Sequence, residues 1–465
     1  MPLPHRLTMA LLLSSALPMA AAGAIELPPP SAAPQKISAE TDPFLKALAE
    51  REGTALFDTS VMTGAANLPA LGEQAEAINA AKEIKDQAQS RLYPDLGVDF
   101  IVSRTLVRDL NNPATPVENL APLNRNDALG SINQLITDFG ATSARIRQSS
   151  AGIAAAKADL DAARNQALLT LISTWYDVLE YRTAVTLAGD NVKRLQDLAQ
   201  GAALRFEGGI DSGGDVARAR AYVAGAQSQQ VNFERQLANA EARYLELFGA
   251  PAPEVARVVA PDVIPSSNQG ERPEVLAAKA QAREAAAAVS AAKADRLPVV
   301  SGRLGANGYN VIQDGTPAYD VRGQIVLSTN FATGGGQASR VSELKARRRS
   351  AELAVERIEL AAARELSVAE ADVAQLRLAI PPLEAAYLDS RRARDLFVEQ
   401  FRVSRGTLFD VLRAERDLLD AALALSRATY DLDVARFNLL AKQNGLIERF
   451  GLSPAAMPVA GQESK

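Results

Sequence analysis

Residues 206–219 read FEGGIDSGGDVARA, and residues 401–414 read FRVSRGTLFDVLRA. The two stretches lie 195 residues apart, and both begin with phenylalanine and end in DV-x-RA. At the same spacing, DFGATSARI at 138–146 aligns with TGGGQASRV at 333–341. Because no gap separates these matches, the pattern predicts a tandem duplication in which the same elements are built twice.

The repeats also match upstream of these stretches, but at a different spacing. Two proline-bounded segments of helical composition, 69–94 and 273–298, lie 204 residues apart. The difference between 204 and 195 means that the first repeat carries nine additional residues. Length variation is typical of a loop, and we place the loop at 105–127, against a shorter one at 311–319.

Segments with a period of two flank both loops. Apolar side chains alternate with a mostly polar set in 96–103 and again in 319–331. Each repeat is thus predicted to form a strand hairpin, within 95–139 and 298–332, with one apolar face. Strands of about 10–13 residues cross a bilayer when tilted, although a half-buried sheet in water shows the same alternation. An aromatic girdle is expected near the strand ends, at Tyr93, Phe139, Tyr309, Tyr319 and Phe331.

Long helices follow the strands. Residues 145–206 contain no proline and keep apolar residues at helical spacing, which predicts a helix of roughly 90 Å. Such a helix is typical of a coiled coil and too long for a compact domain. Glycines in 207–215 turn the chain, Asp215 can cap the returning helix, and that helix extends to about Phe248. In the second repeat, the proline pair at 381–382 predicts a break or bend.

The number of strands bears on assembly. Four strands are too few to close a barrel, and an open sheet edge in lipid leaves backbone groups unpaired at several kcal/mol each. A membrane location therefore requires more than one copy of the chain. Three copies would supply twelve strands, although two or four copies also satisfy this arithmetic.

The first 24 residues have the organisation of a secretory signal peptide. His5 and Arg6 precede an apolar core that ends in small residues. We expect cleavage after the Ala22-Gly23-Ala24 triplet, with Ala20–Ala22 as the second choice. Cleavage removes the single histidine, and the chain has no cysteine. The mature protein then lacks the side chains for Ser/His or Cys/His catalysis, for zinc or haem ligation, and for an N-terminal lipid anchor.

We accordingly expect no catalytic residues, no metal site and no cofactor. The formal net charge of −5 argues against a nucleic-acid partner, which requires a basic surface. Aspartate and glutamate could still perform acid–base chemistry, but they are spread along the expected helix faces as solvated charge. An enzyme is therefore the least favoured class.

The export signal, the duplicated order of helix, strand hairpin and helix hairpin, and the paired motifs DFGATSAR and TGGGQASR resemble the TolC family of outer-membrane efflux and type I secretion channels. The resemblance covers roughly residues 67–448. It implies a mainly α protomer with membrane β structure. Three protomers would form a twelve-stranded outer-membrane β-barrel continuous with a long periplasmic α-helical coiled-coil barrel. The implied partners are outer-membrane lipid, a periplasmic adaptor (membrane fusion) protein, and an inner-membrane ABC-type or proton-driven transporter.

The predicted organisation follows from the repeat and the resemblance. It comprises a signal peptide (1–24), an N-terminal periplasmic segment (25–66), the first repeat (67–248), a proline-rich linker (249–271), the second repeat (272–448) and a tail (449–465). The resemblance implies an exit duct in the outer membrane of a Gram-negative bacterium, with most of the mass in the periplasm. We favour type I protein secretion. Multidrug or small-molecule efflux is the alternative, and a periplasmic coiled-coil adaptor is a third hypothesis.

The resemblance also assigns roles at the turns between the long helices, which correspond to the periplasmic tip. A pore constriction is expected at Asp410, Arg413, Asp215 and Arg218, although an aspartate near a helix start also serves as a cap. Adaptor contacts are expected at Gly208, Gly209, Ile210, Val403, Ser404, Arg405, Gly406 and Thr407.

The stretch FATGGGQASRV at 331–341 has three consecutive glycines ahead of a helix. A phosphate-binding loop requires Gly-Lys followed by Ser or Thr, and Gln337 and Ala338 follow the glycines instead. Because the twin stretch retains a single glycine, we predict a mechanical role at the junction of strand and helix, with Ser339 or Thr333 as caps. The junction glycines are Gly140, Gly334, Gly335 and Gly336.

Overall fold

The computed structural model describes residues 25–31, 33–51, 53–107, 124–209, 212–258, 260, 271–309, 311–312, 318–329 and 334–452. The predicted signal peptide, Ile210, Phe331 and Thr333 lie outside these ranges. The chain divides into two compact units. The hairpin unit comprises Met1–Ser60, Ser173–Ala260 and Gln375–Val434, and the sheet unit comprises Val61–Ile172, Pro261–Ala374 and Ala435–Lys465.

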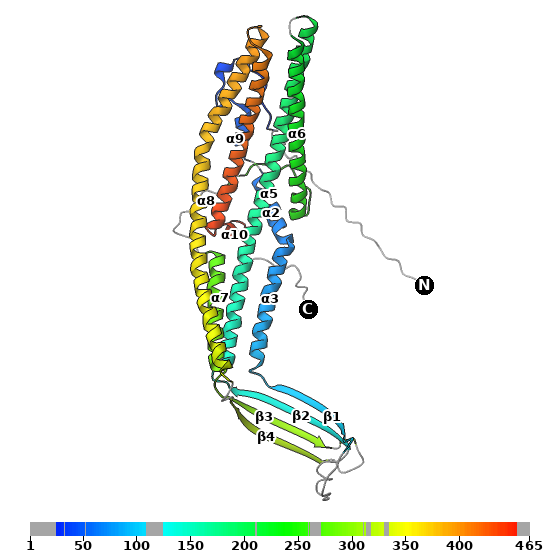
Figure 1. Ribbon diagram of the computed structural model, residues 1–465, viewed down its shortest axis with the longest axis vertical. Helices are drawn as coiled ribbons and strands as arrows, with labels where there is room; N and C mark the ends of the chain where they lie inside the picture. Colours follow the sequence, from blue (N-terminus) through cyan, green and yellow to red (C-terminus); the bar gives the residue numbers. More distant parts are fainter. Residues whose placement is uncertain are drawn as a thin grey trace, which may run out of the picture. The chain divides into compact units, whose positions relative to one another are not determined.

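In the described residues, each repeat contains a shorter helix, two strands and two long helices (Figure 1). The first repeat has α3 (Pro69–Ser90), β1 (Asp95–Arg104), β2 (Asn124–Thr137), α5 (Ala141–Glu207) and α6 (Gly213–Phe248). The second has α7 (Pro273–Ala294), β3 (Val299–Tyr309), β4 (Ala318–Ser328), α8 (Gly336–Arg402) and α9 (Leu408–Lys442). The repeats are preceded by η1 (Pro34–Lys36), α1 (Pro43–Ala49) and α2 (Thr54–Asn67), and followed by α10 (Leu446–Arg449). The prediction of a mainly helical chain with a small amount of sheet is confirmed.

The duplication extends to individual backbone conformations. Four pairs of residues with positive φ lie 195 positions apart, and each pair contains at least one glycine, the residue that adopts this conformation without strain. The pairs are Phe139 (53°) with Gly334 (57°), Gly140 (96°) with Gly335 (83°), Gly209 (73°) with Ser404 (60°), and Gly249 (71°) with Asn444 (61°). The helices α5 and α8 also have the same length, 67 residues. The repeats therefore share their turn positions even where the side chains differ.

Four antiparallel strands form one sheet in the order β1-β2-β3-β4. The pairing of β2 with β3 joins the hairpin of the first repeat to that of the second. The register places Val98 opposite Gly130, Gly130 opposite Ala306, and Ala306 opposite Val321, so this row crosses all four strands. Because directly paired residues point to the same face, this row forms an apolar stripe across all four strands.

Small side chains allow the helices of the sheet unit to pack closely. Most of the buried residues of α7 are alanines, together with Pro273, Val275 and Val289. Arg272, at the start of this helix, donates to Glu365 of α8 at 3.0 Å, and Lys442 of α9 donates to the same carboxylate at 3.0 Å. Ionic contacts at the rim therefore join three helices around an alanine-rich interior.

Aromatic rings form the centre of the hairpin unit. The fully buried Trp175 of α5 lies edge-on to Phe57 at 5.3 Å between ring centroids, and Tyr244 of α6 lies 6.3 Å away. The Trp175 indole N–H donates to the carbonyl of Ala256, in the linker that follows α6. The N-terminal segment and the inter-repeat linker are therefore both fixed to the long helices.

The first long helix of the second repeat, α8, differs from its prediction. α8 is continuous from Gly336 to Arg402, with Pro381 and Pro382 inside it, so the predicted break is wrong. The two missing N–H donors are adjacent and fall within one turn, and the regular hydrogen bonds on both sides maintain the helix. A bend at the proline pair stays a prediction. Among the described residues, no helix combines the length and apolar character needed to cross a membrane.

Candidate functional site

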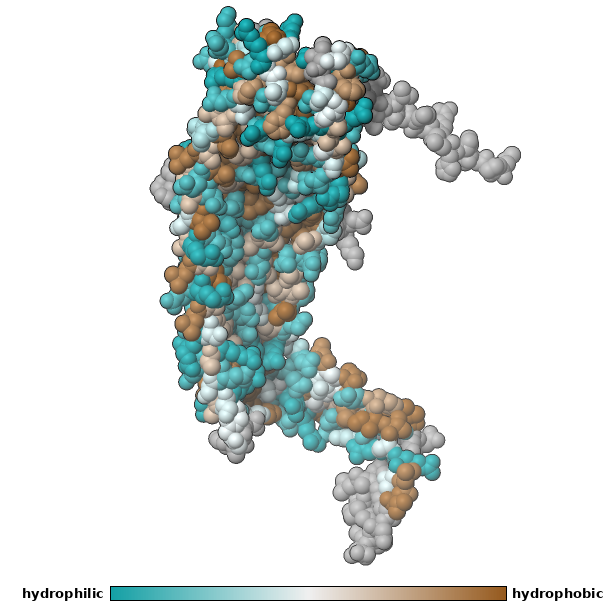
Figure 2. Space-filling model, turned by 45° about the horizontal axis from the view of Figure 1, so that its top comes forward, coloured by the Kyte–Doolittle hydropathy of each residue, from teal (hydrophilic) through white to brown (hydrophobic). Residues whose placement is uncertain are grey.

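The sheet exposes a continuous apolar face. Leu96, Val98, Phe100 and Val102 of β1 share this face with Tyr319, Val321, Ile325 and Leu327 of β4. Val98 is 85% exposed and Ile325 is 79% exposed, whereas isolated water-soluble domains rarely expose an apolar patch of this extent. The patch is visible over the strands as a brown area in Figure 2. A surface with this pattern fits an apolar environment such as lipid.

The opposite face of the sheet carries most of the charged side chains of the sheet, and several of them are paired. Arg303 donates to the Asn133 side chain at 2.9 Å, and Asn307 donates to Asp320 at 2.8 Å. Two ion pairs lie on the same face, Arg125 with Asp127 and Arg322 with Asp320. The two faces are therefore suited to different surroundings, one apolar and one aqueous.

Both outer strands of the sheet are edges within this chain. Among the described residues, β1 pairs only with β2, and β4 pairs only with β3. An exposed edge carries a row of unpaired N–H and C=O groups, which can bind a strand of another chain. The sheet is therefore suited to extension at both ends.

The first strand-to-helix junction contains an unpredicted side chain. Asp138 accepts hydrogen bonds from the N–H groups of Gly140 and Thr142, at 3.2 and 2.7 Å, and from the Thr142 hydroxyl at 2.6 Å. Partial burial raises the pKa of this carboxyl, but the hydrogen bonds outweigh burial, so the Asp138 pKa lies below its usual value. Asp138 thereby satisfies an N–H in the first turn of α5. The spacing of Asp138 and Thr142 is a sequence signal that could have identified it.

The predicted junction glycines occupy different conformations. Gly140, Gly334 and Gly335 have positive φ, and Gly336 is the first residue of α8. The prediction of Ser339 as a cap is wrong, because its N–H already donates to the Gly335 carbonyl at 3.0 Å within the helix. Its place in the first turn follows from the helix starting at Gly336, three residues earlier.

The two turns between long helices carry the same capping arrangement. The Ser212 hydroxyl caps α6 by accepting from the Asp215 N–H at 3.2 Å, and the Asp215 side chain accepts from Ser212 in return. In the second repeat, Thr407 and Asp410 make the same exchange at 3.2 and 2.6 Å. The cap of α6 is therefore Ser212, whereas Asp215 had been predicted. The hydrogen bonds from Ser212 lower the pKa of Asp215.

The predicted constriction residues are close to the turns, and the charge of Arg218 contributes to the lowered pKa of Asp215. Arg413 lies 3.8 Å from Asp417, one turn further along α9, and its side chain is exposed. Arg218 instead lies over the ring of Phe409, 5.1 Å from its centroid. In the first repeat Gly214 occupies the place of Phe409, so the first repeat offers no ring at this position.

The two turns are joined by side chains that the sequence did not indicate. Leu408 and Leu412 of α9 pack into a buried cluster with Val216 and Ala219 of α6. Arg205 of α5 lies 4.7 Å above the Phe401 ring of α8, which adds a second cation–π contact between the repeats. The ends of the two helix hairpins therefore form one packed group within the hairpin unit.

The predicted adaptor-contacting residues are mainly on the surface. Gly208, Gly209, Val403, Ser404, Arg405 and Thr407 are exposed, and Gly406 is partly buried. Ile210 lies outside the described residues. In the part of the chain that the structure describes, no three histidine, cysteine, aspartate or glutamate side chains are grouped to hold a metal ion.

A duplicated chain that combines two long helix hairpins with an apolar-faced antiparallel sheet has the architecture of an outer-membrane channel protomer. Residues 64–250, which include the first repeat, match the family described as outer membrane efflux protein. The resemblance predicted from the sequence is confirmed, because these residues are similar to that family. The family and the fold neighbours are outer-membrane channels, not enzymes.

Relatives support the same assignment. The outer membrane efflux protein BepC of Brucella suis biovar 1 is 22% identical over 318 residues, covering 66% of this chain and 70% of BepC. The outer membrane protein VceC of Vibrio cholerae has a TM-score of 0.74 at 17% identity, covering 84% of this chain and 96% of VceC. The CmeC outer membrane channel of Campylobacter jejuni has a TM-score of 0.75 at 16% identity, and the match covers 84% of this chain and 86% of CmeC. The structural likenesses establish the fold.

Proposed function

We propose that the chain forms, as a homotrimer, the outer-membrane exit duct of a tripartite export system. The observation that carries this proposal is the sheet, which has one apolar face, one polar face and two edges that no other described strand of the chain covers. In lipid, backbone groups at an open edge require partners, and a neighbouring copy supplies them when β1 of one chain pairs with β4 of the next. Twelve strands from three copies then enclose a polar interior, with the apolar face toward the membrane.

In this proposal the long helices continue the duct on the periplasmic side and bring the helix turns to its far end. The turn residues 208–209 and 403–407 are the contact surface for a periplasmic adaptor, and an inner-membrane transporter of the ABC or proton-driven type completes the system. Asp215 and Asp410, with Arg218 and Arg413, line the narrowest part. Single-channel conductance of Asp410→Ala tests that assignment, since unchanged conductance and cation block would refute it.

We favour small-molecule efflux over type I secretion as the transported class. The specific support is the matched family, described as outer membrane efflux protein, and the relative BepC, which carries the same description. The prediction of type I secretion stays the second candidate. It rests on the FRVSRGTLFDVLRA turn.

A deletion strain tests the proposal and separates the two candidates. An efflux duct predicts that cells lacking this chain accumulate a hydrophobic fluorescent dye and release it again when the gene is restored. A secretion duct predicts normal dye release and the retention of an exported polypeptide inside the cell. Recovery of the protein in the soluble periplasmic fraction, without outer-membrane association, would contradict both.

A further inference from the structure

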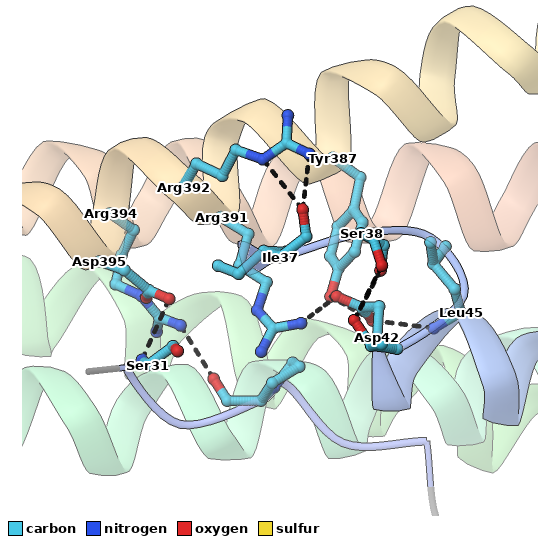
Figure 3. Close-up of polar contacts among 12 residues, drawn as sticks. Ser31, Ile37, Ser38, Asp42, Leu45, Tyr387, Arg391, Arg392, Arg394 and Asp395 are labelled. Carbon is cyan, nitrogen blue, oxygen red and sulfur yellow. Dashed lines mark hydrogen bonds and ion pairs between the residues drawn. The ribbon is translucent and has the colours of Figure 1, made fainter. Parts of the chain in front are cut away.

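A stretch near the N-terminus, residues 27–31 and 33–42, lies against α5 and α8 within the hairpin unit, and we name it the strap (Figure 3). On the α5 side, the Leu27 N–H donates to the Asp190 carboxylate at 3.1 Å. Arg194 donates to the carbonyl oxygens of Leu27 and Pro28, at 2.5 and 3.0 Å. The strap thus binds α5 through its backbone.

The strap also binds α8. Arg394 donates to the Pro28 carbonyl at 2.9 Å, so this single oxygen accepts hydrogen bonds from both helices. Arg391 forms an ion pair with Asp42, and the Tyr387 hydroxyl donates to the same carboxylate at 3.2 Å. Two further hydrogen bonds join Ser31 N–H to Asp395 at 3.1 Å and Arg392 to the Ile37 carbonyl at 2.6 Å. The strap is therefore a bridge between α5 and α8.

Charged side chains at the contact between the strap and α8 are buried. Asp42, Arg394, Asp395 and Glu415 are all buried, and Arg394 also donates to Glu415 of α9 at 3.2 Å. Burial and the Asp42 carboxylate raise the pKa of the Tyr387 phenol, so the hydroxyl stays protonated and donates. Hydrogen bonds are stronger away from water, and separating them would leave buried charges without partners. The contact therefore resists gradual stretching.

The contacts of the strap with α5 and α8 lie close to the helix turns. Arg394 is eight residues before the end of α8 at Arg402, about 12 Å along the helix, and Arg194 is thirteen residues before the end of α5, about 20 Å. The strap itself is stiff at its point of contact, because residues 28–30 are three consecutive prolines with fixed φ. A short, stiff segment bound on both sides fixes the separation of the two helices it joins.

We propose that the strap is a clamp that limits how far the helix-turn end of the duct can open. This inference rests on the proposed function, because it assumes that the long helices line a duct. Widening the end requires α5 and α8 to separate, and the strap opposes that movement through Arg194 on one helix and Arg391 and Arg394 on the other.

Single-channel recording of the purified oligomer in planar bilayers tests the clamp. Arg194→Gln removes the charged donor to the strap from α5, and Asp42→Asn weakens the strap on α8 by removing the charge paired with Arg391. Arg416→Gln is the matched control, because Arg416 is an exposed arginine of α9 in an i,i+4 pair with Asp420 at 3.7 Å. Loss of a charge-assisted hydrogen bond corresponds to a shift of about tenfold in the occupancy of the open level.

We expect both strap variants to increase that occupancy and the control to match the parent. Native electrophoresis of the oligomer shows whether each variant assembles, and if one of the two strap variants does not, the other decides. Assembled strap variants that gate like the parent would overturn the clamp. A parent oligomer without conductance would instead contradict the proposed duct, so the two failures are distinguishable.

Discussion

The sheet and the strap depart from the usual arrangement of side chains in opposite directions. On the sheet, large apolar side chains face outward, with Val98 85% exposed. Around the strap, charged side chains lie inside, with Arg394 0% and Asp42 1% exposed. An outward apolar face is stable when its surroundings are apolar, and buried charges are stable when each has a partner. The apolar face therefore fits the proposed location in lipid, and the buried charges around the strap are stabilised by their partners in the protein interior.

The largest expected effect breaks the strap side of this comparison. Arg394→Ala leaves the buried Asp395 and Glu415 carboxylates without their cation. Removing one member of a buried ion pair costs about 3–5 kcal/mol of folding free energy. Thermal unfolding of the detergent-solubilised protein measures the loss. Arg416→Ala, at an exposed pair, should cost less than about 1 kcal/mol, and an equal effect at both positions would contradict the account.

The next effect tests the two faces of the sheet. Val98→Arg places a cation on the apolar face and should cost about 2–4 kcal/mol if that face lies in lipid near the bilayer centre. Asp99→Arg, at the adjacent residue of β1, places the same side chain on the polar face and should cost much less. Equilibrium unfolding from lipid vesicles measures both. Equal costs would mean that the exposed apolar face is not in lipid.

The twin turns allow a finer comparison within the hairpin unit. Gly209 and Ser404 both have positive φ, yet only one is glycine. Gly209→Ala should cost about 1 kcal/mol through backbone strain alone, because the space around its added Cβ is open. Ser404→Gly should increase stability because glycine adopts positive φ without strain. The gain should be less than about 1 kcal/mol, the cost expected at Gly209, since glycine also has more freedom in the unfolded chain. Limited proteolysis at the turns reports both changes.

The smallest effect concerns the junction of sheet and helix. Asp138→Ala should cost about 1 kcal/mol or less at neutral pH, because it removes the acceptor for the first turn of α5. The Asp138 pKa is lower in the folded chain than its ordinary value of 3.8, so its contribution is present above that pH and is lost as the pH falls further. Unfolding curves recorded at neutral and at acidic pH should therefore show a difference in stability between variant and parent that becomes smaller as the pH falls. A difference that grows on acidification would contradict this role.

The sequence was most informative where structure is local or repeated. The 195-residue spacing identifies the duplication, and periods of 3.6 and two distinguish the long helices from the strands. The prolines of α8 led to the wrong prediction of a break. Proline disfavours helix at its own position, but the regular helix on both sides of the pair, 67 residues in all, outweighs this local cost. The strap was not predicted at all. Asp42 and Arg391 are 349 residues apart in the sequence. From the sequence alone, an arginine-rich helix face is interpreted as a solvent-exposed charged surface, because the segment that covers it is known only from the fold.

The turn residues illustrate the same limit at the candidate site. The positions of Asp215 and Asp410 follow from the repeat, but their exchange of hydrogen bonds with Ser212 and Thr407 is visible only in the structure. The contact between Arg218 and Phe409 joins two repeats whose sequences give no sign of it. Spacing along the chain locates such residues, whereas their partners depend on tertiary packing.

The mass of the detergent-extracted protein in native mass spectrometry tests the central claim most directly. The account predicts a complex of three chains, recovered from the outer-membrane fraction, because three four-stranded sheets pair their free edges into one closed structure of twelve strands. A stable single chain in detergent would contradict it, since the edges of β1 and β4 would then have no partners. A complex of two or four chains would contradict the twelve-stranded closure.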